Sequence, residues 1–246
     1  FLSAAHAITH VSKSLIPTDS GSSIYIRPFM FATDTSLGIK PSETFRFMIL
    51  ASPSTSYFKP GDLNVFIERQ ASRACPGGVG TAKTGGNYAA SLKSAKKAAQ
   101  YNCQQTLWLD ALQHKYIEEM SGMNFMAIEN GKLITPQLTD TILAGITRDS
   151  ILSLSKEMGL EPIEQKIDID DFLAKVQSRV STEAFACGTA VIIVPITRFV
   201  DGDKPSFDAQ EATGNWSMKI RNKLLNIQEG RDKGPVGWSV KAERTY

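Results

Sequence analysis

The segment GGVGTAKTGGNY, residues 77–88, is the most informative stretch of this sequence. Its glycines and small residues allow the backbone to turn sharply and to approach a ligand closely. Residues 64–68 before it predict a strand, and the Ala- and Lys-rich residues 89–100 after it predict a helix. Lys83 therefore lies in a loop between a strand and a helix, and is the candidate functional residue of this loop.

Residues 77–84 almost match the phosphate-binding pattern G-x-x-x-x-G-K-[ST], but Ala82 replaces the glycine before the lysine. That position needs close backbone approach to phosphate, which only glycine permits. A P-loop lysine also opens a helix, whereas Gly85 and Gly86 are expected to break one. Nucleotide binding is therefore disfavoured, and a flexible turn with a surface lysine remains the alternative to a functional Lys83.

The residues after Lys83 show a clear resemblance. Gly-Gly-Asn, Tyr88 and an Ala-rich helix follow it, in an order that resembles the cofactor-lysine segment of fold-type IV pyridoxal-phosphate aminotransferases. The branched-chain members of that family commonly have K-x-G-G-N-Y there. The resemblance implies that Lys83 carries pyridoxal phosphate as a Schiff base. It also implies that Tyr88 hydrogen-bonds the phenolic oxygen of the cofactor.

The segment YIRP, residues 25–28, resembles a segment at the substrate end of the branched-chain enzymes. Side chains two apart on a strand lie on one face, so Tyr25 and Arg27 are expected to lie together. The planar guanidinium of Arg27 suits bidentate recognition of a carboxylate. A plain strand with no ligand is the alternative.

The segment EEMSGMN, residues 118–124, resembles the family pattern E-E-x-x-x-M-N. By position, Glu119 corresponds to the carboxylate that pairs with the pyridine nitrogen of the cofactor. Such a carboxylate keeps the ring protonated and makes it a stronger electron sink. Taken alone, Glu118 and Glu119 would instead indicate a solvated acidic turn.

The segment LAGITRD, residues 143–149, resembles L-P-G-I-T-R-D of the family, with Ala144 in place of the proline. Gly145 allows a tight turn, and Thr147 is expected to cap the following helix. The free backbone N–H groups at such a helix start form an anion site. The resemblance implies that Gly145, Ile146 and Thr147 hold the cofactor phosphate, whereas a helix start without a ligand is the alternative.

The segment ACGTA, residues 186–190, resembles S/C-G-T-A of the same family. The resemblance implies that Gly188 and Thr189 also contact the phosphate and that the backbone of Ala190 faces the substrate. An ordinary glycine-bearing strand edge is the alternative. Arg73, ten residues before Lys83, corresponds to a family arginine near the cofactor.

Composition excludes several other classes of function. A net charge of +2 and 42% hydrophobic residues are ordinary for a globular protein and indicate neither nucleic-acid nor membrane binding. The three cysteines form no disulfide pattern, and the histidines and cysteines suggest no metal site. The cysteine pattern favours a reducing compartment, and we expect a cytoplasmic or mitochondrial protein. Because the chain begins at Phe1, a targeting signal cannot be read from it.

Strands and helices are mixed without regular alternation, which predicts an α+β (mixed α/β) fold. We expect a helix within residues 1–16 with one buried face, and a polar linker at 52–62. Residues 1–51 would be the end of a small domain, and 63–246 a large cofactor-binding domain. The remaining strands are predicted at 24–32, 44–51, 106–109, 116–117, 124–128 and 190–200, and the remaining helices at 148–158, 169–180 and 216–227.

Family members carry additional chain before the position of Phe1, and it forms most of the small domain. Three explanations stay open: the sequence is a fragment, a separate polypeptide supplies that segment, or the protein works without it. The resemblance implies transamination of leucine, isoleucine and valine with 2-oxoglutarate by a homodimer. The alternatives are an aminodeoxychorismate lyase, a D-amino-acid or amine transaminase of the same fold, and a non-catalytic relative.

Overall fold

The computed structural model describes residues 1–54, 63–209 and 216–242, which belong to two compact units. The first unit comprises Phe1–Tyr57 and Ile227–Tyr246, and the second comprises Phe58–Asn226. This division differs from the predicted one, because residues 227–246 group with the start of the chain. Residues 52–54 of the predicted linker are strand, and its residues 55–62 lie outside the described part of the chain.

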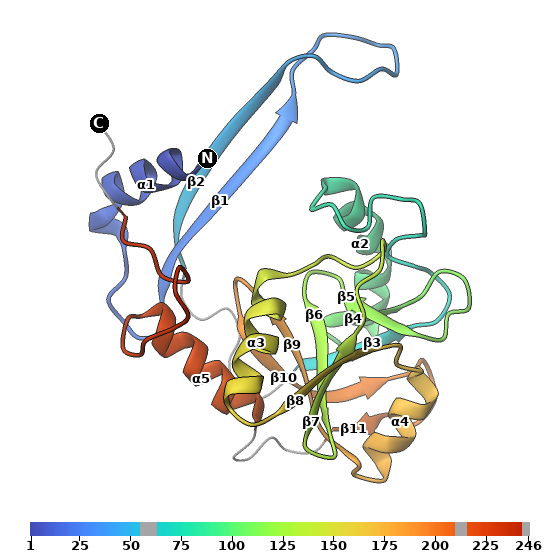
Figure 1. Ribbon diagram of the computed structural model, residues 1–246. Helices are drawn as coiled ribbons and strands as arrows, with labels where there is room; N and C mark the ends of the chain where they lie inside the picture. Colours follow the sequence, from blue (N-terminus) through green and yellow to red (C-terminus); the bar gives the residue numbers. More distant parts are fainter. Residues whose placement is uncertain (55–62, 210–215, 243–246) are drawn as a thin grey trace. The chain divides into compact units, whose positions relative to one another are not determined.

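The first unit contains a short helix and a long two-stranded antiparallel ribbon (Figure 1). Helix α1 (Leu2–Val11) and a 3-10 turn (Lys13–Leu15) precede strands β1 (Ser23–Ala32) and β2 (Phe45–Ser54). The prediction of a helix here is confirmed, but that of a buried helix face is wrong. No residue of α1 is buried, and Val11 is 73% exposed. A single short helix beside two strands offers too little surface to cover it.

The second unit is built on a sheet of nine strands. Pairing runs from β10 through β3, β4, β5, β6 and β9 back to β10, and so closes a ring of six strands. Strands β7 and β8 extend the sheet from β6, and β11 extends it from β10. The strands are β3 (Leu63–Glu68), β4 (Gln105–Leu109), β5 (Ile117–Met120), β6 (Asn124–Glu129), β7 (Lys132–Pro136), β8 (Glu161–Gln165), β9 (Ser181–Gly188), β10 (Ile192–Val200) and β11 (Phe207–Asp208).

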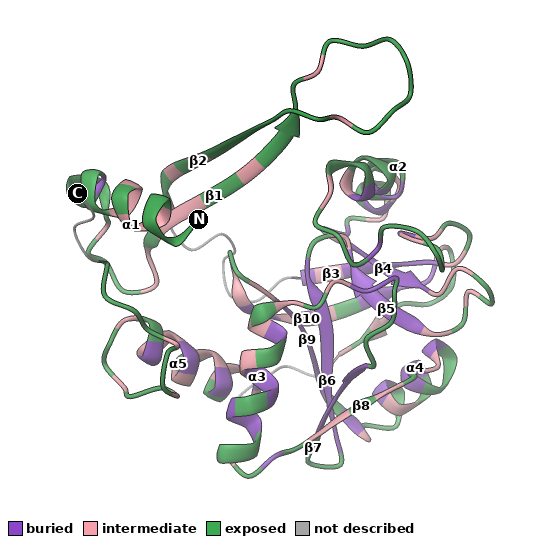
Figure 2. Ribbon diagram, turned by 45° about the horizontal axis from the view of Figure 1, so that its top comes forward, coloured by how far each residue is buried: buried purple, intermediate pink, exposed green. Residues whose placement is uncertain are grey.

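Alternate residues of the ring strands form the main hydrophobic core. Side chains two apart on a strand share a face, so this core fills the inside of the ring. Figure 2 shows β3, β4, β5, β6 and β9 as almost wholly buried, and β10 as partly buried. Phe172 joins this core from a helix, and its ring packs edge-on against Phe125 of β6 and Phe199 of β10.

Four helices accompany this sheet, and they are α2 (Gly85–Gln100), α3 (Ile146–Glu157), α4 (Ile169–Gln177) and α5 (Trp216–Gln228). Helix α2 packs on β3 and β4, α3 on β8 and β9, and α4 on β9 and β11. The mixed α/β prediction is confirmed. None of the helices in the described ranges is long and apolar enough to cross a membrane.

Four strands were not predicted from the sequence, and the shortest of them is the two-residue β11. Strands β7 and β8 are short and contain Pro136 and Pro162, and β9 mixes polar, small and acidic residues. Their strand conformation depends on pairing with distant partners, such as β9 between β6 and β10. Pro195 does not interrupt β10, because the strand changes partners from β9 to β3 just after it.

Candidate active site

A cavity of about 470 Å³ opens in the second unit among the loop before α2, the turn between β5 and β6, the start of α3 and the end of β9. Every residue that the sequence assigned to the cofactor lines this cavity, namely Arg73, Lys83, Tyr88, Glu119, Gly145, Ile146, Thr147, Gly188 and Thr189. Segments far apart in the sequence therefore meet at one place.

The three residues assigned to the substrate do not line this cavity. Ala190 follows Thr189 in the turn between β9 and β10, and is exposed. Tyr25 and Arg27 lie on β1 in the first unit, where the guanidinium of Arg27 stacks 4.9 Å from the centroid of the Tyr25 ring. The expected proximity of these two side chains is therefore confirmed, whereas their part in the site stays a prediction.

The amine of Lys83 is directed at a phenol. Its Nζ donates a hydrogen bond to the hydroxyl of Tyr88 at 2.7 Å. Helix α2 begins at Gly85, so Lys83 stands two residues before a helix and Tyr88 lies in the first turn of that helix. The expectation that Gly85 and Gly86 break the helix is therefore wrong. Ala82 still sets this loop apart from a P-loop.

Close backbone packing holds the loop before Lys83 in place. A Cβ on Gly80 would lie 2.6 Å from Cα of Thr141, so only glycine fits there. Arg73 reinforces the contact, because its Nη2 donates to the carbonyl oxygens of Gly80 at 2.9 Å and of Thr141. The loop that carries Lys83, here called the lysine loop, is thus bound to the segment that leads into α3.

Glu118 and Glu119 are buried neighbours on β5, with 7% and 3% of their surface exposed. The alternative of a solvated acidic turn is therefore wrong. Glu119 Oε1 lies 2.6 Å from Nη2 of Arg73 and accepts from the backbone N–H of Leu143 at 3.1 Å. Burial raises the pKa of Glu119 to about 7, although Arg73 acts in the opposite direction.

Asn124 supports this carboxylate and was not assigned a role from the sequence. Its Nδ2 donates to Oε2 of Glu119 at 3.0 Å and to the carbonyl oxygen of Leu143 at 2.9 Å. A Cβ on Gly145 would overlap Oδ1 of Asn124, so a side chain there would displace the Asn124 amide from its hydrogen bonds. The sequence did contain a signal for a role of Asn124, because Asn124 is the last residue of the segment EEMSGMN.

The start of α3 lines the cavity with Gly145, Ile146 and Thr147. The helix begins at Ile146 with Gly145 as its N-cap, and no side chain caps it. The prediction that Thr147 is the cap is therefore wrong, because Thr147 lies within the first turn. The N–H groups of a first turn have no partner inside the helix and favour a negative group. With Gly188 and Thr189 close by, this end of the cavity suits an anion.

The thiol of Cys187 lines the same cavity but does not supply a nucleophile. It is fully buried, and burial raises its pKa to about 12. A thiol with such a pKa stays protonated at neutral pH and reacts slowly. Lys83 is therefore the candidate nucleophile of the cavity.

Comparisons with known proteins agree with this geometry. The family described as Amino-transferase class IV matches residues 3–199. A branched-chain-amino-acid aminotransferase of Mycobacterium tuberculosis is 41% identical, over 98% of this chain and 67% of that protein. The branched-chain amino acid aminotransferase of Escherichia coli superposes with a TM-score of 0.75 at 29% identity, over 90% of this chain and 71% of that one.

A third relative is the branched-chain amino acid aminotransferase of Thermobaculum terrenum, solved in its PLP-form, the holo-form. It superposes with a TM-score of 0.72 at 25% identity, over 85% of this chain and 65% of that one. The present chain spans about two thirds of the length of these relatives.

Proposed function

Because this chain belongs to the class IV aminotransferase family, we propose that it transaminates branched-chain L-amino acids with pyridoxal phosphate held at Lys83. The observation that carries the proposal is the single cavity that gathers the Lys83 amine, the Tyr88 phenol, the Glu119 carboxylate and the start of α3. By family resemblance the amino donors are leucine, isoleucine and valine, and 2-oxoglutarate is the acceptor. The products are 2-oxo acids and glutamate.

The polar groups of the cavity fit pyridoxal phosphate. The cofactor carries an aldehyde, a phenolic oxygen, a pyridine nitrogen and a phosphate, and the cavity offers one complementary group for each. These are a primary amine at Lys83, a hydroxyl at Tyr88, a buried carboxylate at Glu119 and a helix N-terminus at Ile146. When bound, the cofactor's ring takes up the electron pair released as the substrate loses its α-proton.

Lys83 has two tasks in this proposal. Its Nζ holds the cofactor covalently until the amino group of the substrate takes its place. Once free, the amine would accept the α-proton of the substrate at Nζ and would donate that proton back in the next transfer. The 2.7 Å hydrogen bond to Tyr88 keeps Nζ directed into the cavity.

Glu119 would pair with the ring nitrogen of the cofactor and would favour its protonated form. Arg73, Asn124 and the N–H of Leu143 hold both oxygens of Glu119 in position from behind. The pKa of about 7 means that the carboxyl group is part-protonated at neutral pH before the cofactor binds. A protonated ring nitrogen beside it favours the ionised carboxylate, so cofactor binding lowers this pKa.

Within this chain, backbone groups at the start of α3 would hold the phosphate of the cofactor. The N–H groups of Ile146 and Thr147 open α3 and favour the negative charge through the helix dipole. Gly188 and the hydroxyl of Thr189 complete this end of the cavity.

Substrate recognition is assigned to the other residues that the sequence identified. Arg27 binds the carboxylate of the substrate or of 2-oxoglutarate, since its fork can donate two parallel hydrogen bonds. Tyr25 supports Arg27, because the guanidinium stacks over its ring. The backbone of Ala190 faces the substrate, next to Thr189 at the phosphate end of the cavity.

Homodimerisation is a further part of the proposal. In the first unit several large apolar side chains of β1 and β2 are exposed, among them Met30, Phe31, Phe45 and Phe47. Apolar surface of this kind usually contacts other protein. Sedimentation velocity should show a dimer, and a fully active monomer at assay concentration would contradict this part.

The test of the function combines a label with a half-reaction. Purified protein should absorb as a bound pyridoxal phosphate, and borohydride followed by peptide mapping should place the cofactor on Lys83. Addition of leucine should change the absorbance spectrum of the bound cofactor in the wild type, and should not change it in Lys83→Ala. Lys93→Ala is the control and should behave as the wild type, because Lys93 is exposed on α2. A label on another lysine contradicts the proposal.

A substrate panel separates the alternatives. A faster half-reaction with D-amino acids or simple amines than with leucine would indicate another member of the same fold. Bound cofactor with no half-reaction at all would indicate a non-catalytic relative.

A further inference from the structure

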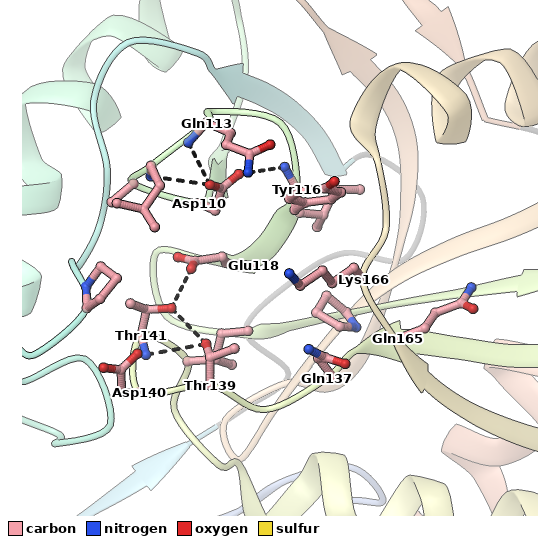
Figure 3. Close-up of a pocket in the computed structure, with 16 residues that line it drawn as sticks. Asp110, Gln113, Tyr116, Glu118, Gln137, Thr139, Asp140, Thr141, Gln165 and Lys166 are labelled. Carbon is pink, nitrogen blue, oxygen red and sulfur yellow. Dashed lines mark hydrogen bonds between the residues drawn. The ribbon is translucent and has the colours of Figure 1, made fainter.

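A second cavity lies in the same unit, beside β5, and Figure 3 shows the side chains that line it. Glu119 faces the first cavity and its neighbour Glu118 faces the second, as expected for consecutive residues of a strand. The second cavity encloses about 680 Å³ of space, part of which is open to solvent. Its walls are largely apolar and include Leu112, Ile117 and Ile142. The two cavities share no lining residue.

Glu118 brings an incompletely bonded carboxylate to this cavity. The residue is more than nine-tenths buried, and its Oε1 accepts a hydrogen bond from Oγ1 of Thr141. Among the described residues, none donates a hydrogen bond to Oε2. Buried polar atoms are almost always paired in folded proteins, because an unpaired one loses its hydration without compensation. Oε2 of Glu118 is therefore an acceptor suited to a ligand.

The other acidic groups of the cavity are already engaged. Asp110 accepts from four backbone N–H groups, those of Leu112, Gln113, Lys115 and Tyr116. Asp140 accepts from the N–H of Gly77 at 2.8 Å. Both still contribute negative charge, so the cavity favours a cation near Glu118.

Arg73 lowers the pKa of Glu118 through its charge, but no cation among the described residues forms an ion pair with Glu118. Nη2 of Arg73 is occupied by Glu119 and by the carbonyl oxygens of Gly80 and Thr141. Lys166 lines the cavity with its amine over the ring of Tyr116, 5.3 Å from the centroid. Consistent with this, burial raises the pKa of Glu118 in spite of Thr141 and Arg73.

We propose that this cavity binds a small ligand with an apolar body and an ammonium head. The ammonium group donates to Oε2 of Glu118, and the body packs on Leu112, Ile117 and Ile142. An apolar amino acid and the corresponding amine share this chemistry. The amino acid carries in addition a carboxylate that Lys166 can attract. The inference does not depend on the proposed transamination, because no cofactor residue lines this cavity.

Binding is measured by calorimetry on protein treated with borohydride, so that a cofactor at Lys83 cannot react with amines. Three probes share one branched apolar body: leucine, isoamylamine without the carboxylate, and isocaproate without the amine. Leucine and isoamylamine should bind, and isocaproate should not. A lower Kd for leucine than for isoamylamine identifies the amino acid as the better occupant, and the reverse identifies the amine.

Two pocket variants and one matched control locate the binding. Glu118→Gln removes the charge and should raise the Kd about tenfold or more. Leu112→Trp fills the cavity from a side chain that is 78% exposed, so folding is preserved, and should abolish binding. Glu129→Gln is the control, since Glu129 is also buried with one unpartnered oxygen but does not line this cavity.

Any one of three results overturns the inference. The first is unchanged binding in both pocket variants, the second is binding of isocaproate equal to that of leucine, and the third is no binding of any probe at millimolar concentration. If borohydride fixes no cofactor at Lys83, the proposed transamination fails, and the calorimetry still tests this cavity.

Discussion

At the scale of single residues, Glu118 and Glu119 show how strand geometry separates two adjacent identical side chains. They face different cavities and have different partners, Thr141 for Glu118 and Arg73 with Asn124 for Glu119. Burial raises the pKa of both. The motif in the sequence could identify the pair, but only the packing around each residue decides its chemistry.

The raised pKa of Glu119 predicts a pH dependence of stability in cofactor-free protein. The folded chain retains this proton up to about pH 7, whereas the unfolded chain releases it near 4.5. The folded state therefore binds more protons in this window, and the free energy of unfolding should fall as pH rises through it. The decrease should be roughly 1–3 kcal/mol, on the scale of 1.36 kcal/mol per pKa unit. Urea unfolding at a series of pH values measures it.

Two variants test whether Glu119 causes the decrease of the free energy of unfolding with pH. Glu119→Gln should reduce the decrease, while Glu129→Gln, a buried carboxyl outside both cavities, should leave it in place. An unchanged slope in Glu119→Gln would show that another group is responsible.

At the scale of elements, the site depends on how the turn between β5 and β6 meets the start of α3. Asn124 at the beginning of β6 contacts both Glu119 and the chain at Leu143, just before the helix. Gly145 lies against Asn124 and allows this approach. The carboxylate and the anion end of the cavity are thus positioned by one contact between two elements.

Replacement of Gly145 should therefore disturb both the Glu119 carboxylate and the anion end of the cavity. In Gly145→Ala the new Cβ overlaps Oδ1 of Asn124, and overpacking of this kind costs about 1–3 kcal/mol. Cofactor affinity should fall as well, because Asn124 supports Glu119. Urea unfolding and an absorbance titration with pyridoxal phosphate measure the two effects.

Gly86→Ala is the matched control, since Gly86 lies in the first turn of α2, where an added Cβ would meet no other part of the chain within 4 Å. It should keep or slightly raise the stability, by up to about 1 kcal/mol. Equal effects of the two substitutions would contradict the assigned contact.

At the scale of the whole second unit, closure of the six-stranded ring brings the lysine loop, β5, β9 and α3 to one cavity. The core inside the ring holds this arrangement, and Phe172 of α4 contributes a ring that packs on Phe125 and Phe199. The stability of the ring and the geometry of the site therefore depend on the same core.

Removal of one core ring should show this dependence. Phe172→Ala should lower the free energy of unfolding by about 3–5 kcal/mol, because it removes a fully buried ring and leaves a cavity. Leu112→Ala, at an exposed position, should change it by no more than about 0.5 kcal/mol. Urea unfolding measures both, and a small effect of Phe172→Ala would contradict the central place of this ring.

Many features of this protein can be predicted from short stretches of its sequence. The residue order around Lys83, the β-rich run at 24–32 and the helices predicted at 148–158 and 169–180 depend on local sequence, and the structure contains the corresponding elements. The residues assigned to the cofactor line one cavity for the same reason, since each belongs to a short recognisable segment. Local errors, such as the start of α2 and the cap of α3, arose where tertiary packing overrode local preference.

Tertiary structure alone decided the rest. Strand β9 is held between β6 and β10, and Arg73 meets Glu119 far along the chain, by contacts that no local pattern encodes. The same is true of Asn124 against Gly145 and of the unpaired oxygen of Glu118 in a second cavity. The sequence by itself determined which residues are chemically able to act. Their burial, and with it their pKa and partners, follows from long-range pairing that places distant segments side by side.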